Sequence, residues 1–487
     1  MTAVVADRSG WQRMADRIRF DAASERTLSV LSWSVPAAVM AVLGLLGAST
    51  PGLWTDELAT WALATAPLED LFRVLGNTDA SIGPYYLFMH VWLAVFGDSE
   101  LALRAPSILA MTGATALIVA LGTRLGGRRV GVLAGLLFAL VPSVSRYAHE
   151  ARPYALVAFL AVLATYLLVR VIDRPGVLGL VCYGLTMALL GLGHVVALLL
   201  LAAHGLTVLA MRRGLIWRWS AAAAVAVAAA APVLYLGQRQ QAQISWIPEL
   251  TVLRLLQSPG VLAGSAVVGG TLLVLSFLAF SWRAPALVWT LWAVLPTIGL
   301  VLASLAVPMW LPRYLLFTLP AWALLAATAV SRTRLLRGAA FLALVAVLAV
   351  YEHVQLRGAA GHTQDPRAVG AVLNQHALPS DAVIYGRFDD FTSRLAVARY
   401  TEAAHRPEDV LVEVASLKNG YIRASECAAA DSCAGTPDRV WVIRSGDKAD
   451  VLANIGKDRE ALLRAGYVTA QTWKQSGFTV ALLTRKP

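Results

Sequence analysis

The chain has 487 residues, of which 58% are hydrophobic and only 15% are charged. A soluble protein of this length does not need so much apolar surface, so the composition excludes an ordinary soluble domain. The net charge of +11 comes mostly from arginines in short loops. No basic stretch has interleaved aromatic residues or a binding motif, so the charge indicates membrane orientation and argues against nucleic-acid binding.

Apolar runs recur along residues 28–352, and each is long enough to cross about 30 Å of hydrocarbon. Placing the arginine-rich connections in the cytoplasm gives one consistent orientation with about eleven transmembrane helices. The sequence therefore predicts a polytopic α-helical membrane protein. Its expected spans are 28–49, 103–121, 130–146, 153–170, 177–192, 195–211, 219–236, 257–281, 286–306, 313–330 and 337–352.

The first apolar run follows a polar, arginine-rich arm, residues 1–27, which we expect in the cytoplasm. The run lacks a clear small-residue cleavage site, so we predict a retained signal anchor. Alanine, valine, leucine and arginine dominate while lysine is scarce, a composition typical of GC-rich bacterial genomes. We therefore expect a multi-pass protein of the bacterial plasma membrane.

The first outer loop, residues 50–102, contains adjacent acids in the segment Trp54-Thr55-Asp56-Glu57. An acid at the membrane surface can take a proton from a sugar hydroxyl or hold a metal ion. The alternative is that both are solvated loop acids. Within the same loop, residues 84–96 form an aromatic-rich apolar stretch that is short for a span, so we expect a helix lying in the membrane interface.

The second outer loop gathers Arg146, His149, Glu150 and Arg152 in one short turn before Tyr154. Charges at this depth are costly unless they pair or serve a site. An arginine can bind a phosphate with two parallel hydrogen bonds. Glu150 could join Asp56 on a metal ion or orient an arginine, and a structural ion pair between Glu150 and Arg152 is the alternative.

Two further outer segments contain candidate residues. Arg313 begins a span next to Tyr314, either as an arginine extending to the membrane surface or as a second phosphate ligand. Trp246, within residues 238–249, belongs to a loop that could close over a lipid or sugar, or it anchors the chain at the interface. His194 and His204 lie in apolar runs, where we expect packed, hydrogen-bonded histidines.

The composition changes at about residue 353, after which apolar runs shrink to strand length. The pattern predicts a small α/β domain outside the membrane, residues 353–487, with a structural or acceptor-binding role. Cys427 and Cys433 are close enough for a disulfide loop but also fit two thiols. The expected elements are strands 383–385, 440–443 and 478–484 and helices 364–375 and 450–465.

The sequence resembles the GT-C glycosyltransferases, specifically bacterial relatives of the protein O-mannosyltransferases and of the aminoarabinose transferases that modify lipid A. The resemblance covers about residues 30–350. The segments that carry it are Trp54-Thr55-Asp56-Glu57, Gly83-Pro84-Tyr85-Tyr86, Arg104-Ala105-Pro106-Ser107, His149-Glu150-Ala151-Arg152-Pro153-Tyr154-Ala155-Leu156 and Pro312-Arg313-Tyr314-Leu315.

The resemblance implies transfer of a sugar from a polyprenyl-phosphate donor to a glycolipid, polysaccharide or protein acceptor at the outer face. Asp56 would be the base or the acceptor anchor, and Glu57 would support it. Glu150 would help hold a metal, such as magnesium or manganese, or the donor phosphate. Family members with a lysine near the interfacial helix use it for phosphate, and here Gly83 and Pro84 stand in its place.

Arg152 and Arg313, with Tyr314, would therefore take over the donor phosphate. Trp54, His149, Tyr154 and Trp246 are the expected substrate-binding residues. Mannose is the expected sugar, and single displacement would invert the anomeric centre. A lipid flippase and a non-catalytic accessory subunit are the alternatives, although the sequence lacks the internal repeat that many transporters show.

Overall fold

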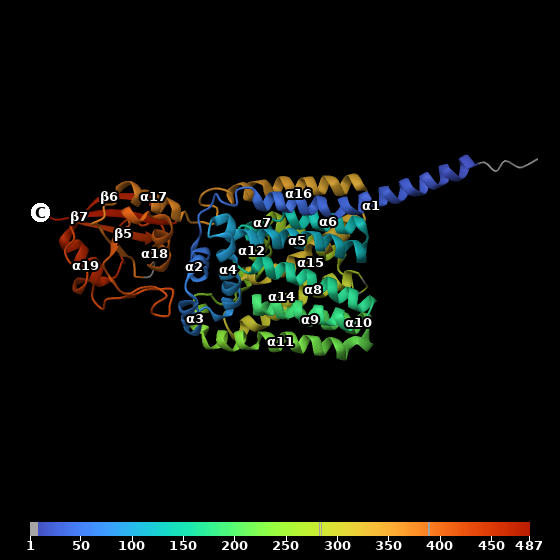
Figure 1. Ribbon diagram of the computed structural model, residues 1–487, viewed down its shortest axis with the longest axis horizontal. Helices are drawn as coiled ribbons and strands as arrows, with labels where there is room; N and C mark the ends of the chain where they lie inside the picture. The colour runs from blue at the N-terminus through green and yellow to red at the C-terminus, as the bar shows by residue number, and fades with distance from the viewer. Residues whose placement is uncertain (1–7, 282, 284, 388–389) are drawn as a thin grey trace, which may run out of the picture.

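A computed structural model describes the backbone of residues 8–281, 283, 285–387 and 390–487. The molecule is elongated, with a helical bundle in the middle and the C-terminal domain at one end (Figure 1). Helix α1, Arg8–Leu45, extends beyond the opposite end of the bundle. The start of α1 and the C-terminal domain thus project from opposite ends, as the predicted orientation requires. Which end faces the cytoplasm stays a prediction.

The bundle consists of helices whose apolar stretches follow the predicted spans. Among the described residues, seven helices are long and apolar enough to cross a membrane, or up to nine if two bent pairs each count as one span. The predicted eleven also require α9 and the 195–211 segment, which are shorter apolar helices. Besides α1 the bundle contains α5 (Glu100–Gly126), α6 (Arg128–Leu140), α7 (Pro142–Ala148), α8 (Tyr154–Asp173), α9 (Val177–Gly193), α10 (Leu200–Met211), α11 (Ile216–Arg239), α12 (Val252–Ala263), α13 (Ala266–Ala279), α14 (Ala286–Ala306), α15 (Leu319–Ser331) and α16 (Leu335–Gln355).

Two of the expected spans are bent pairs of helices, because the chain breaks within them. The span predicted at 130–146 is α6 followed by α7, with a 67° bend. Pro142 starts α7 and cannot continue the hydrogen bonds of α6. The span predicted at 257–281 is α12 followed by α13, bent by 99°. There Gly264 adopts a left-handed conformation, with φ +74°, which ends α12.

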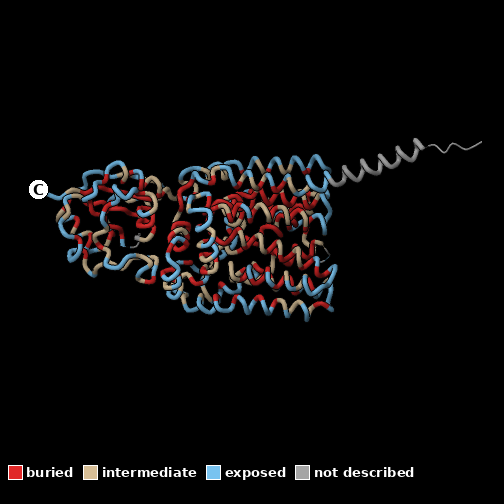
Figure 2. The backbone as a smooth tube through the Cα atoms, viewed as in Figure 1, coloured by how far each residue is buried: buried red, intermediate tan, exposed pale blue. Residues whose placement is uncertain are grey.

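Small residues let the bundle helices approach closely. A Cβ atom on Gly131 of α6 would lie 2.4 Å from the carbonyl oxygen of Val119 in α5. Gly122 of α5 would meet the Gly131 backbone in the same way. Buried residues concentrate between the helices, while the outermost helices expose their outer faces (Figure 2). This arrangement is typical of membrane bundles, where close packing replaces the hydrophobic effect as the driving force.

Three helices of the first outer loop cap the bundle: α2 (Thr55–Thr65), α3 (Leu68–Asn77) and α4 (Gly83–Phe96). Helices α2 and α4 run across the bundle axis, between the bundle and the C-terminal domain (Figure 1). The crosswise position of α4 agrees with the interfacial helix predicted at 84–96. The cap therefore separates the apolar part of the molecule from the polar part.

The C-terminal domain contains a five-stranded sheet in the order β2-β1-β5-β7-β6. Strand β1 is parallel to β2 and β5, and β7 pairs antiparallel with β5 and β6. The predicted α/β character and all the predicted strands are found. Its elements are α17 (Pro366–His376), α18 (Asp390–Tyr400), α19 (Lys457–Gly466), β1 (Ala382–Tyr385), β2 (Glu408–Asp409), β3 (Val412–Val414), β4 (Ser425–Glu426), β5 (Arg439–Ser445), β6 (Tyr467–Gln475) and β7 (Phe478–Arg485).

The start of α19 differs from the prediction, and the state of the two cysteines of this domain is resolved. The helix predicted at 450–465 starts only at Lys457, because Asn454 and Gly456 have positive φ angles that interrupt a helix. The Asp450 carboxylate accepts a hydrogen bond from the Leu452 N–H, which forms a turn instead. Cys427 and Cys433 form a disulfide, whereas Cys182 is a free cysteine in α9.

The close contact of α5 and α6 gives a stability prediction. We expect Gly131→Ala to lower the midpoint of thermal unfolding, because the added methyl group overlaps the Val119 carbonyl and forces the helices apart. Gly176→Ala is the control, since a Cβ there meets no atom within 4 Å. Tryptophan fluorescence of the purified protein during heating measures both. Equal midpoints for the two variants would show that close packing of α5 and α6 is dispensable.

Candidate active site

A cavity of about 960 Å³ lies where the bundle, the cap and the C-terminal domain meet. The cap contributes Asp56, from α2, to its wall. The bundle contributes Arg152, from the turn before α8, and Arg313, from the helical turn Pro312–Thr318. Trp246 and Tyr421 line it from two loops. Residues that are hundreds of positions apart thus share one solvent-filled space at the end of the apolar bundle.

Asp56 faces two arginines in this cavity. Its Oδ2 atom lies 3.9 Å from Arg152 Nε and 3.8 Å from Arg313 Nη1. These distances are too long for direct hydrogen bonds. The Nε atoms of both arginines are buried and have no hydrogen-bond partner among the described residues. Two buried guanidinium donors without partners are ready to bind an anion.

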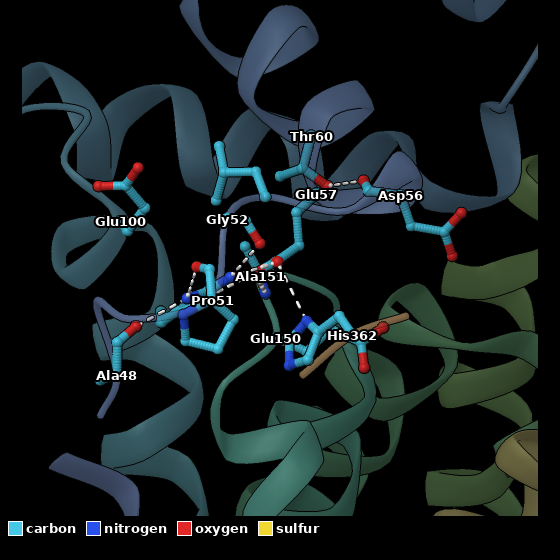
Figure 3. Close-up of polar contacts among 12 residues, drawn as sticks. Ala48, Pro51, Gly52, Asp56, Glu57, Thr60, Glu100, Glu150, Ala151 and His362 are labelled. Atoms are coloured by element: carbon cyan, nitrogen blue, oxygen red, sulfur yellow. Dashed lines mark hydrogen bonds and ion pairs between the residues drawn. The ribbon is translucent and has the colours of Figure 1, made fainter. Parts of the chain in front are cut away.

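Glu57 follows Asp56 in sequence but points into a different environment, toward Ala151 and His362 (Figure 3). Its carboxylate is fully buried and accepts hydrogen bonds of 2.8 Å and 2.6 Å from the Arg104 guanidinium. The Ala151 N–H donates a third, at 2.9 Å. Burial opposes ionisation, but the Arg104 charge prevails and holds the pKa of Glu57 well below its usual range.

The same arginine also fixes the chain that leads into α2. Its Nη atoms donate to the carbonyl oxygens of Ala48, Pro51 and Gly52 at 2.7–3.1 Å. Glu57 and Arg104 therefore join α2 to α5 and to the turn that contains Arg152. The geometry gives Glu57 a positioning role, because the pair orients α2 so that Asp56 faces the cavity.

Asp79 also lines the cavity, although no sequence motif marks it as a site residue. It adopts a left-handed conformation, with φ 58°, and its carboxylate accepts a 3.0 Å hydrogen bond from the Tyr86 hydroxyl. Arg152 Nη1 donates to the same hydroxyl at 3.2 Å. Burial raises the pKa of Asp79. In the sequence Asp79 is one of several acids in the first outer loop. The positive φ that distinguishes it cannot be read from the sequence.

An aromatic wall lies beside Arg313. The rings of Tyr154 and Tyr314 contact His194, at centroid distances of 5.8 Å and 4.7 Å. All three residues line the cavity. Tyr154 and Tyr314 were candidate site residues in the sequence, and their substrate contacts stay a prediction. His194 differs from the expected packed, hydrogen-bonded histidine, because its Nδ1 has no partner among the described residues. His204 fits that expectation, since Tyr183 and Thr165 contact both of its ring nitrogens.

The other predicted site residues occupy different positions. Trp246 lines the cavity, and the Arg313 guanidinium lies 5.7 Å from its ring centre. Trp54 and His149 are not among the cavity-lining residues. Instead, Trp54 lies 5.9 Å from the Arg146 guanidinium, and His149 Nε2 contacts the Gly44 carbonyl at 2.8 Å. Burial lowers the pKa of His149 to about 4, so its ring is neutral at pH 7.

The residues present do not fit the predicted metal site. No group of three or more His, Cys, Asp or Glu side chains that could hold a metal ion occurs among the described residues. Glu150 is buried outside the cavity lining, with Arg146 Nε 3.9 Å from its carboxylate. A cation next to Asp56 would also face the charges of Arg152 and Arg313. We therefore derive no chemical step that uses a metal.

Comparisons with known proteins agree with this geometry. Residues 82–236 match the family model described as dolichyl-phosphate-mannose-protein mannosyltransferase. A comparison with curated proteins finds no match. Among solved structures, ArnT from Cupriavidus metallidurans in the apo state is 15% identical to this chain, with a TM-score of 0.64. The match covers 93% of this chain and 98% of ArnT.

The structure of ArnT bound to undecaprenyl phosphate matches over the same shares of both chains, with 15% identity and a TM-score of 0.60. Similarity over nearly the whole of both chains shows a common architecture, including the C-terminal domain. This chain has the GT-C fold. The resemblance predicted from the sequence is thus confirmed at the level of the fold.

The buried ion pair between Arg104 and Glu57 gives a second prediction. We expect Arg104→Ala to lower the free energy of unfolding by about 3–5 kcal/mol, because it leaves the buried Glu57 carboxylate without its partner. The matched control is Arg124→Ala, which breaks a pair with Asp173 whose side chains are 36% and 44% exposed. That loss is about 0–1 kcal/mol. Thermal unfolding compares the variants, and similar shifts would contradict a structural role for Arg104.

Glu150 gives a pH prediction. Burial raises the pKa of its carboxyl from 4.5 to about 8. Between these values the folded protein retains a proton that the unfolded chain has lost, so this group makes the free energy of unfolding fall as pH rises. The contribution is full below pH 4.5 and is lost by about pH 8. We expect Glu150→Gln to remove this fall.

Unfolding midpoints of wild type and Glu150→Gln at several pH values from 5 to 8.5 test this prediction. The difference between the two proteins isolates Glu150, because the contributions of the other titrating groups cancel. Glu413→Gln is the control, since Glu413 is exposed on β3. An unchanged pH dependence in Glu150→Gln would show that Glu150 is ionised throughout.

Proposed function

We propose that the protein transfers a sugar from a polyprenyl-phosphate donor to a hydroxyl-bearing acceptor at the outer face of the bacterial plasma membrane. The observation that carries the proposal is the arrangement of Asp56 between Arg152 and Arg313, at the mouth of an apolar bundle. The Nε atoms of both arginines have no hydrogen-bond partner among the described residues. A base next to an anion-binding pair is what transfer from a lipid phosphate requires.

The donor supplies a charged leaving group whose tail belongs in the membrane. Arg152 and Arg313 lie at the bundle end of the cavity, so a phosphate bound there keeps its prenyl chain near the apolar helices. The two guanidinium groups would neutralise the charge that develops as the phosphate departs. Tyr314, in the adjacent wall, would contact the same end of the donor.

Asp56 would act as the base. As the acceptor hydroxyl oxygen attacks the anomeric carbon, the bond from that carbon to the phosphate oxygen breaks, and its electron pair leaves with the polyprenyl phosphate. The hydroxyl proton passes to the Asp56 carboxylate. This single displacement inverts the anomeric centre and needs no covalent sugar–enzyme intermediate.

Two similarities support the choice of donor. ArnT, whose fold this chain shares, was solved with undecaprenyl phosphate bound. The matching family model is named for dolichyl-phosphate-mannose. Mannose is accordingly the first sugar to test, with arabinose and aminoarabinose next. The acceptor would be a glycolipid, a polysaccharide or a protein, and the C-terminal domain would lie outside the membrane with it.

We expect Asp56→Asn to lower the rate of transfer from a short-chain polyprenyl-phosphate mannose by about 10²–10⁴-fold, because the amide cannot take the proton. Binding of the donor should change little, since both arginines remain. Glu69→Gln is the control, because Glu69 is an exposed acid on α3 outside the cavity lining. Purified protein and labelled donor measure both quantities.

Other outcomes separate the alternatives. A flippase or an accessory subunit does not need the base, so Asp56→Asn would then leave its activity unaffected. A wild-type protein that binds no polyprenyl-phosphate sugar would count against the proposed function as a whole.

A further inference from the structure

One wall of the cavity comes from the C-terminal domain, in the loop of residues 415–424 that connects β3 to β4. Within this 415–424 loop, Asn419, Tyr421, Ile422, Arg423 and Ala424 all line the cavity. An acceptor-binding role was one of the two expected for this domain, but no motif marks the loop, which lies more than 350 residues from Asp56 along the chain. Its position makes the C-terminal domain part of the site.

The tip of the loop is fixed to the cap. Lys418 Nζ lies 2.7 Å from Asp70 Oδ2 on α3. The Asn77 side-chain amide, at the end of α3, donates to the Gly420 carbonyl at 3.2 Å. Gly420 has a φ of +82°, and a Cβ there would lie 2.5 Å from Asn77 Nδ2. Only glycine fits such a close approach, so the tip is held in one position.

The base of the loop is fixed to the C-terminal domain. Glu426 on β4 accepts hydrogen bonds from Arg394 and Arg459. The disulfide between Cys427 and Cys433 follows directly. Because both ends are anchored, the loop forms a preorganised wall, which lowers the entropic cost of binding a ligand.

The reaction geometry decides which substrate meets this wall. The donor phosphate belongs on the bundle side, because its lipid tail lies in the membrane and its partners are Arg152 and Arg313. In a single displacement the attacking oxygen approaches the anomeric carbon from the side opposite the leaving phosphate. The C-terminal domain, which carries the 415–424 loop, lies at the end of the molecule away from the bundle (Figure 1). The loop is therefore placed to contact the acceptor.

The chemistry of the loop distinguishes between acceptors. Tyr421 is 49% exposed and offers a rigid apolar ring with a polar hydroxyl at its tip. Such a side chain suits a sugar, which has apolar C–H faces and polar edges. An extended peptide instead needs a row of unpaired backbone groups. Here Leu417 N–H donates to the Tyr421 carbonyl, and Tyr421 N–H donates to the Asn419 side chain.

We infer that the 415–424 loop binds a carbohydrate acceptor and that Tyr421 packs against its sugar ring, an inference that rests on the proposed function. Tyr421 is then a specificity-determining residue in contact with the acceptor. Lys418 is a positioning residue, which acts by holding the loop against α3. Neither residue contacts the donor phosphate.

Binding of sugars tests the inference directly. The probes are methyl mannoside, methyl glucoside, methyl arabinofuranoside and a Ser/Thr-rich peptide, added to protein in lipid nanodiscs free of glycoside detergent. Saturation-transfer NMR should detect at least one glycoside with the wild type, and we expect Tyr421→Ala to reduce that signal several-fold. Val414→Ala is the matched control, because Val414 is 40% exposed on β3 but does not line the cavity.

Transfer kinetics provide the second measurement. With the glycoside that is used as acceptor, Tyr421→Ala should raise the acceptor KM about 5–20-fold, the loss expected for one apolar ring contact. The KM for the donor should not change. Lys418→Ala should raise the acceptor KM less, because the Asn77 side chain still donates to the Gly420 carbonyl and holds the tip of the loop. Tyr421→Phe keeps the ring and should restore most of the binding.

The outcomes separate this inference from the proposed function. If the wild type transfers sugar but Tyr421→Ala leaves glycoside binding and the acceptor KM unchanged, the inference is wrong and the proposed function stands. Binding of the peptide with no glycoside signal would also overturn it. If glycosides bind through Tyr421 while no donor binds, the carbohydrate site stands and the proposed transfer is wrong.

Discussion

The buried contact between Glu57 and Arg104 is the constraint on which the site depends. Every hydrogen-bonding nitrogen of the guanidinium is used, by the Glu57 carboxylate and by three carbonyl oxygens of the chain before α2. A buried pair of this kind is costly to form, but it defines one geometry because either charge without the other would be buried uncompensated. The catalytic candidate next to it, Asp56, owes its direction to that geometry.

Two neighbouring acids on α2, Asp56 and Glu57, have opposite electrostatic environments. Glu57 is fully paired and excluded from solvent, whereas Asp56 lines the cavity and lies beyond hydrogen-bond distance of two arginines. The first acid stabilises the fold and the second remains available for chemistry. The Nε atoms of Arg152 and Arg313 have no hydrogen-bond partner among the described residues, and the anionic donor proposed above would supply one.

Sequence patterns predicted the parts of this protein that depend on local physics. Hydropathy and arginine placement located most spans, and the motifs around Asp56, Arg152 and Arg313 identified residues that meet in the cavity. The breaks after α6 and α12 were missed because average hydropathy does not detect a bend at Pro142 or Gly264. Asp79 and Tyr421 were missed because their roles depend on tertiary contacts between distant segments.

The segment between α16 and α17 has a consequence for biosynthesis. Gln364 accepts hydrogen bonds from the Thr55 backbone and side chain at the start of α2, and His362 lies 3.4 Å from Glu57. Residues translated after all the bundle helices therefore complete the environment of residues near the start of the chain. A ribosome that stopped after α16 would release a chain with all its bundle helices but without these contacts or the outer wall of the cavity. Such a truncated product could insert into a bilayer and still lack a finished site.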